Sequence, residues 1–160
     1  MALKSNYDSG RFEKEVSEQV DSLNERILAE FIRAGEKFVT EAREQEQSHE
    51  LGHYKDVTSN LRNSICCFVF LDGELVHENQ IGNAVENKQI AQELVLPKGF
   101  QLIGIAGKNY ASYVESKGYN VISYQADTCM VELATYLETL EVIEKGTGAG
   151  IEESFIPHEL

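Results

Sequence analysis

With 160 residues, 42% of them hydrophobic, the chain is long enough to bury one core and fits one domain. Its formal net charge of −13 argues against a surface that grips nucleic acid, and its apolar runs are too short to cross a membrane. Residues 1–50 carry 12 acids and 7 bases, residues 51–125 carry 7 and 6, and residues 126–160 carry 8 and 1. The opening segment lacks the apolar core of a signal peptide, which predicts synthesis in the cytoplasm.

The N-terminal region, residues 1–48, is predicted to form one long amphipathic helix, and its helical pattern runs over residues 9–47. Apolar residues recur there at steps of three and four, namely Val16, Val20, Leu23, Ile27, Phe31, Ala34, Phe38 and Ala42. Gly35 is the one weak point, where a bend is expected. A straight helix of this length reaches about 55 Å, against a radius of gyration of roughly 15 Å for a globule of this size. Part of the apolar stripe must therefore be buried at a bend or by another chain.

The central region, residues 54–124, predicts a small, mostly antiparallel, four-stranded sheet. Thr58 reads as the N-cap of a short helical turn, Ser59 to Ser64. An unbroken apolar run of strand length follows at 65–71, so this strand needs cover on both faces. Asp72-Gly73 predicts a two-residue hairpin that leads into a return strand at 74–79.

The second half of the chain predicts further strands and two helices. Residues 80–99 suit either a loop with a helical turn or a second short hairpin. Residues 100–106 predict a third strand, in which Gly104 marks a close approach or a bulge. Asn109 to Lys117 predicts a short helix closed by Gly118, and Asn120 to Tyr124 a fourth strand. A C-terminal helix at 126–145 and a flexible tail at 146–160 complete the chain. The expected fold is one α+β domain over residues 1–145.

The three cysteines fit a reducing compartment. Cys66 and Cys67 are neighbours on a strand, so their side chains point to opposite faces and cannot easily form a disulfide. Cys129 falls in the predicted C-terminal helix. We interpret all three as small core residues rather than redox or metal groups.

One catalytic signature occurs, His49-Glu50-Leu51-Gly52-His53, which matches H-E-x-x-H. On a helix, the two histidines can bind zinc and Glu50 can activate water. Polar segments flank the motif, however, and no third ligand is assigned; His77, Glu74 and Glu78 are candidates by composition alone. We therefore predict a surface connection with no catalytic residue, metal or cofactor, and keep a small zinc-dependent hydrolase as the alternative. A third interpretation is an acidic cytoplasmic adaptor whose N-terminal helix binds a coiled-coil partner.

Thr58–Ile65 (TSNLRNSI) and Tyr110–Gly118 (YASYVESKG) are two segments that resemble those of a known family, the tail-completion or neck proteins of long-tailed bacteriophages. Thr58-Ser-Asn-Leu-Arg-Asn-Ser-Ile65 resembles the family's T-G-x-L-R-x-S-I segment. Tyr110-Ala-Ser-Tyr-Val-Glu-Ser-Lys-Gly118 resembles its Y-A-x-Y-V-E-x-G segment. The order of predicted elements also agrees over roughly residues 10–143. The chain departs from the family pattern at two places. It has Ser59 where the family usually has glycine, and its segment 77–100 is longer.

The resemblance implies a structural virion protein with no enzymatic activity. Such proteins form homo-oligomeric rings at the neck or tail end, join head to tail, and line the passage through which DNA slides without specific binding. The expected partners are other copies of the chain and neighbouring neck, tail-terminator or tail-tube proteins, with no membrane; the expected location is the virion. The residues expected to set structure and interfaces are Thr58, Leu61, Arg62, Ser64, Tyr110, Tyr113, Glu115 and Gly118.

Overall fold

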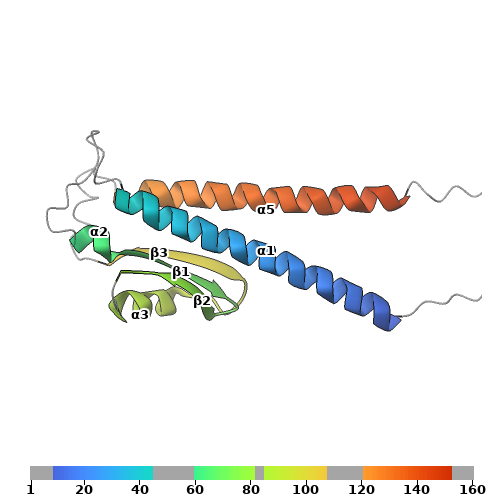
Figure 1. Ribbon diagram of the computed structural model, residues 1–160, viewed down its shortest axis with the longest axis horizontal. Helices are drawn as coiled ribbons and strands as arrows, with labels where there is room; N and C mark the ends of the chain where they lie inside the picture. The colour runs from blue at the N-terminus through green and yellow to red at the C-terminus, as the bar shows by residue number, and fades with distance from the viewer. Residues whose placement is uncertain (1–8, 45–59, 82–84, 108–120, 153–160) are drawn as a thin grey trace, which may run out of the picture.

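The computed structural model describes residues 9–44, 60–81, 85–107 and 121–152. In chain order it contains α1 (Ser9–Glu44), α2 (Asn60–Ser64), β1 (Ile65–Leu71), β2 (Glu74–Asn79), α3 (Val85–Leu94), β3 (Phe100–Ala106) and α5 (Ser123–Glu152). Figure 1 shows α1 and α5 on one side of the sheet and α3 on the other. The predicted α+β class, with a long N-terminal helix and a C-terminal helix, is confirmed.

Within the described residues, the sheet has three strands in the order β2-β1-β3, and β1 pairs antiparallel with both neighbours. The prediction of a fourth strand at 120–124 is wrong for the residues described, because Val121 and Ile122 form a bend and Ser123 begins α5. Val121 is fully buried and packs with Leu61 of α2. The apolar residues that suggested a strand instead hold the start of α5 against α2.

The hairpin between β1 and β2 forms at the predicted residues. Asp72 has φ of 51° and Gly73 of 83°, the positive angles that a two-residue turn needs. The turn also contacts the approach to β3, since the Asp72 amide donates to the Gly99 carbonyl at 3.1 Å. In return, the Gly99 amide donates to Asp72 Oδ1 at 2.9 Å. The central hairpin is thus held to the segment that begins the third strand.

Strand β1 is covered on both faces, as its unbroken apolar sequence predicts. Ile65 and Cys67 belong to a core cluster with α1 and α5, whereas Cys66, Phe68 and Phe70 belong to a second cluster with Ala91 of α3. All six residues from Ile65 to Phe70 are buried. The neighbouring thiols therefore lie on opposite faces of the sheet, as expected.

Helix α1 lies very close to the sheet. The prediction of a bend at Gly35 is wrong, because α1 is one unbroken helix from Ser9 to Glu44 and runs straight in Figure 1. A Cβ atom at Gly35 would lie 2.9 Å from Cys67 Sγ and 3.0 Å from Leu102 Cδ1. Glycine at this position leaves room for the sheet rather than breaking the helix. Gly104 of β3 marks a close approach, as predicted, because its added Cβ would lie 2.7 Å from the Phe38 ring.

Replacing Gly104 with alanine tests this contact. Glycine inside a strand is normally a weak choice, so a Gly104→Ala change would be expected to stabilise the strand if space allowed. Here the new methyl group overlaps the Phe38 ring, and we expect the free energy of unfolding in urea to fall by about 1–3 kcal/mol. Adding Phe38→Leu should make the cost of Gly104→Ala much smaller, and strictly additive costs would contradict the contact.

The remaining helices differ in extent from the prediction. Helix α3 resolves the two alternatives left open for residues 80–99, because Val85–Leu94 forms a ten-residue helix. Helix α5 begins at Ser123 and ends at Glu152, so it extends past the predicted 126–145 at both ends and includes the glycine-rich residues 146–150. Residues 153–160 and the predicted short helix at 109–117 lie outside the described residues.

Candidate functional site

Most of the sequence-predicted site residues lie outside the described part of the chain. These are His49, Glu50 and His53 of the H-E-x-x-H motif, and Thr58, Tyr110, Tyr113, Glu115 and Gly118. Within the described ranges, no group of three or more histidine, cysteine, aspartate or glutamate side chains could hold a metal ion. Of the structural residues predicted, Leu61, Arg62 and Ser64 are described.

Leu61 and Ser64 lie in the turn that precedes β1. Leu61 is 1% exposed, and Ser64 Oγ donates to its carbonyl oxygen at 2.7 Å. The Ser64 carbonyl in turn accepts from Gly107 N at 3.3 Å and from Asn87 Nδ2 at 3.2 Å. Arg62 is half-buried on the same turn. This junction joins α2, β1, the end of β3 and α3, and sequence reasoning missed the part played by Asn87.

Asn87 gives a direct test of the junction. Its side chain is 4% exposed, and its Nδ2 also contacts Cys66 Sγ at 3.3 Å. Replacing Asn87 with alanine removes buried hydrogen bonds, and we expect the free energy of unfolding to fall by about 1–3 kcal/mol. Gln92→Ala, at an exposed position of the same helix, should leave the urea midpoint nearly unchanged. Equal midpoints for the two variants would contradict the assigned role.

The most prominent unburied feature is the N-terminal part of α1, residues 9–30, which we name the projecting segment. The 36 residues of α1 span about 54 Å, whereas a seven-residue strand spans about 24 Å. The buried residues of α1 all lie between Ala34 and Ala42, and the rings of Phe31 and Phe100 meet with centroids 5.7 Å apart near the limit of the sheet. Beyond that contact the helix extends past the sheet (Figure 1).

The projecting segment carries an apolar stripe that no other described element buries fully. Phe12 is 53% exposed, Val16 41% and Val20 49%, and Leu23 and Ile27 are half-buried. From residue 12 to residue 42 the apolar positions recur in steps of four, four and three, a period of 11 residues that keeps a stripe nearly straight along a helix. The face that is buried near Phe38 therefore continues, exposed, along the projecting segment.

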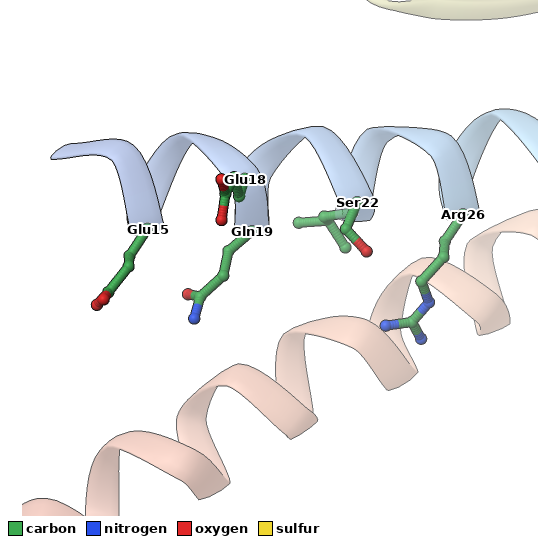
Figure 2. A pocket seen from close by; sticks show the side chains of 6 residues that line it. Glu15, Glu18, Gln19, Ser22 and Arg26 are labelled. Carbon is green, nitrogen blue, oxygen red and sulfur yellow. The ribbon is translucent and has the colours of Figure 1, made fainter. Parts of the chain in front are cut away.

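A hollow of about 490 Å³ lies beside the projecting segment. Its lining residues are Glu15, Glu18, Gln19, Ser22, Leu23 and Arg26. Figure 2 shows Glu15, Gln19 and Arg26 pointing toward the ribbon of α5. Because five of the six lining residues are polar or charged, this hollow fits water or a polar surface better than an apolar small molecule.

Helix α5 is attached to α1 near its own first turns. Cys129 Sγ contacts the Ala34 carbonyl at 3.8 Å, and Glu132 pairs with Lys37 and approaches Arg33 at 4.0 Å. The hydrogen bond to Glu132 raises the pKa of Lys37. Tyr124, Met130 and Val131 of the same helix are 66–68% exposed. The outer face of α5 thus adds to the unburied apolar surface of the molecule.

A polar network joins α1 to β2. His77 Nε2 lies 2.6 Å from Glu36 Oε1, and Asn79 Nδ2 donates to Glu36 Oε2 at 2.5 Å. Arg43 donates to the Ile65 carbonyl at 2.6 Å and to Asn79 Oδ1 at 3.4 Å. Burial lowers the pKa of Arg43, and the nearby Arg62 charge acts in the same direction. His77, which the sequence offered only as a candidate zinc ligand, therefore has a specific partner in Glu36 that its sequence context did not reveal.

The prediction of buried, free cysteines is confirmed for all three residues. Burial raises the pKa of the Cys66 thiol to about 11 and that of Cys67 to about 12, and burial also raises the pKa of Cys129. Because the thiolate is the reactive form, these side chains are poor nucleophiles at neutral pH. They serve as core residues.

Comparison of the chain with protein-family models, curated proteins and solved structures found no match. Among the helices of the described residues, none combines the length and hydropathy needed to cross a membrane. The geometry thus defines an α+β protein with a half-exposed long helix, and its most distinctive feature is the apolar stripe of the projecting segment.

Proposed function

We propose that this chain is a structural protein of a tailed-phage virion. It assembles into a homo-oligomeric ring at the neck or tail end, where it completes the tail and joins it to the head. The observation that carries this proposal is the straight apolar stripe that leaves the core and continues, exposed, along the projecting segment. The phage assignment comes from the resemblance at residues 58–65 and 110–118.

The exposed stripe favours association between copies. Burying the remaining exposed surface of Phe12, Val16 and Val20 contributes about 1 kcal/mol for each side chain, since complete burial of such residues contributes about 1.5–3 kcal/mol. The exposed side chains of α5 add to this surface. An amphipathic helix that leaves its apolar face uncovered is a common means of binding a partner.

In the proposed ring, a different surface of the neighbouring copy covers the projecting segment. The segment extends past one end of the sheet, where such a surface can reach it (Figure 1). A contact between two different surfaces repeats from copy to copy, and it closes into a ring when the rotation allows. Neighbouring neck, tail-terminator or tail-tube proteins are the proposed partners above and below.

The net charge of −13 suits a passage for DNA. Acidic side chains along a lumen repel phosphates and offer no affinity from counterion release, so DNA can slide without being held. The proposed role is therefore mechanical rather than catalytic, and the wall of the ring needs no specific DNA contact.

Electron microscopy of the purified chain tests this proposal. We expect ring-shaped particles with an open centre, and a field of particles of single-copy size would overturn it. Elemental analysis of the same sample tests the alternative hydrolase. Stoichiometric zinc that is lost in a His49→Ala variant would favour that alternative over the ring.

A further inference from the structure

The two outer strands of the sheet differ in how they are protected from pairing with another strand. β2 has a bulge where its register shifts opposite Val69 and Phe70, and it carries Glu74, His77 and Glu78. Bulges and charged residues are the usual means by which proteins guard a sheet edge. β3, Phe100-Gln-Leu-Ile-Gly-Ile-Ala106, is uncharged, contains no proline and pairs with β1 in an unbroken register. Among the described residues, the sheet thus has one edge guarded by a bulge and charges and one edge, β3, that carries neither.

The pairing register of β3 with β1 shows which backbone N–H and C=O groups of β3 point away from β1. Gly107 N donates to the Ser64 carbonyl and Asp72 N donates to the Gly99 carbonyl, so odd-numbered residues of this segment form the hydrogen-bonded pairs with β1. Even-numbered residues, Leu102 and Gly104 among them, direct their N–H and C=O groups away from β1. In the described part of the chain, no strand pairs with this edge.

The accessible stretch is centred on Ile103. Gly104 is exposed, and Leu102 and Ile103 are half-buried. Toward the end of the strand, Ala106 packs in the same clusters as Ile122, which restricts access there. An incoming strand would therefore meet the middle of β3 most readily.

We propose that the outer edge of β3 binds β3 of a second copy, antiparallel and about a two-fold axis at Ile103. In this register Leu102 of one copy and Gly104 of the other exchange two hydrogen bonds, and the symmetric pair repeats the exchange. Ile103 faces Ile103 of the partner copy, an apolar cross-strand pair. A second copy fits because two uncharged strands meet without repulsion, whereas Glu74 and Glu78 would place acids at a contact made through β2.

This contact is separate from the ring interface. A two-fold contact uses the same surface on both copies and joins them in pairs, whereas a ring requires a contact between two different surfaces. The β3 contact therefore does not depend on the proposed function.

An Ile103→Cys variant of the full chain tests the contact. Directly opposed residues in a non-hydrogen-bonded antiparallel pair have Cα atoms about 4.5 Å apart, within the range that a disulfide spans. Under mild oxidation we expect most of the chain to run as a covalent dimer on a non-reducing gel, at twice the 18.0 kDa mass. Val76→Cys, at a 42% exposed position on the guarded strand, is the matched control and should stay almost entirely monomeric. The buried native cysteines should give no dimer in the unmodified chain.

The outcomes separate this proposal from the ring. Dimer yields that are equal for Ile103→Cys and Val76→Cys would overturn the β3 contact, even if rings form. Ile103→Cys could form the disulfide-linked dimer while the unoxidised chain never assembles beyond two copies. That result would support the β3 contact and contradict the ring. As a second readout, Ile103→Lys places like charges on the axis and should abolish pairing in sedimentation. Because Ile103 also packs against the cluster of Cys66, Phe68 and Phe70, its urea midpoint should fall, and a cooperative urea transition checks that the variant is still folded. Pairing that survives this change would also overturn the contact.

Discussion

A chain with Val16 and Val20 both replaced by aspartate is expected to lose its higher assembly and to form no species larger than two copies. The two valines are 41% and 49% exposed and lie on the stripe that the proposed ring buries. Burying even one unpaired carboxylate at such an interface costs several kcal/mol. Since every copy contributes the same contact, the loss applies at each interface of a ring.

The measurement is light scattering on size-exclusion fractions of the variant and the unmodified chain. A matched control, Gln19→Glu with Ser22→Asp, adds the same two charges to polar positions that line the hollow beside α5. The control should keep the assembly of the unmodified chain. If both variants dissociate equally, general charge repulsion is responsible and the stripe is not the interface.

Alkaline pH is expected to destabilise the fold through the two thiols of β1. In the folded chain the pKa of Cys66 is about 11 and that of Cys67 about 12, whereas 9.0 is the ordinary value that applies after unfolding. Between these values the folded state holds protons that the unfolded state has released. Stability is therefore complete below about pH 9 and falls as the pH rises, by about 1.4 kcal/mol per pH unit for each thiol.

The two thiols together therefore remove about 5 kcal/mol between pH 9 and pH 11. Urea unfolding across this range measures the slope. Lysine and tyrosine side chains also titrate there, so the informative comparison is with Cys66→Ala and Cys67→Ala, each of which should flatten the slope by the contribution of one thiol. An unchanged slope in both variants would contradict the burial of these groups.

The elements that sequence reasoning placed correctly are those whose signals are local. The apolar run at 65–71, the Asp72-Gly73 turn and the period of α1 each depend on neighbouring residues, and each forms as predicted. Gly104 was predicted to mark a close approach or a bulge, because glycine inside a strand has few other uses, and the structure shows the close approach. The identity of its neighbour, Phe38 on α1, could not be read from the sequence.

The features that were missed depend on contacts between distant residues. Glu36 and His77 are 41 positions apart, and Asn87 and Ser64 are 23 apart, so no local pattern marks either pair. Val121 and Ile122 have strand-like character, but their packing against α2 and α1 decides the outcome and leaves β3 as an outer strand. The exposed stripe was anticipated only as an excess of helix length, and its continuity with the core required the structure.

The mass of the native assembly in solution shows whether copies of the chain associate through the stripe of the projecting segment. Native mass spectrometry of the unmodified chain is expected to show one discrete species of three or more copies of the 18.0 kDa subunit. A species of one or two copies at every concentration, with the stripe of the projecting segment exposed to solvent, would rule out the proposed ring.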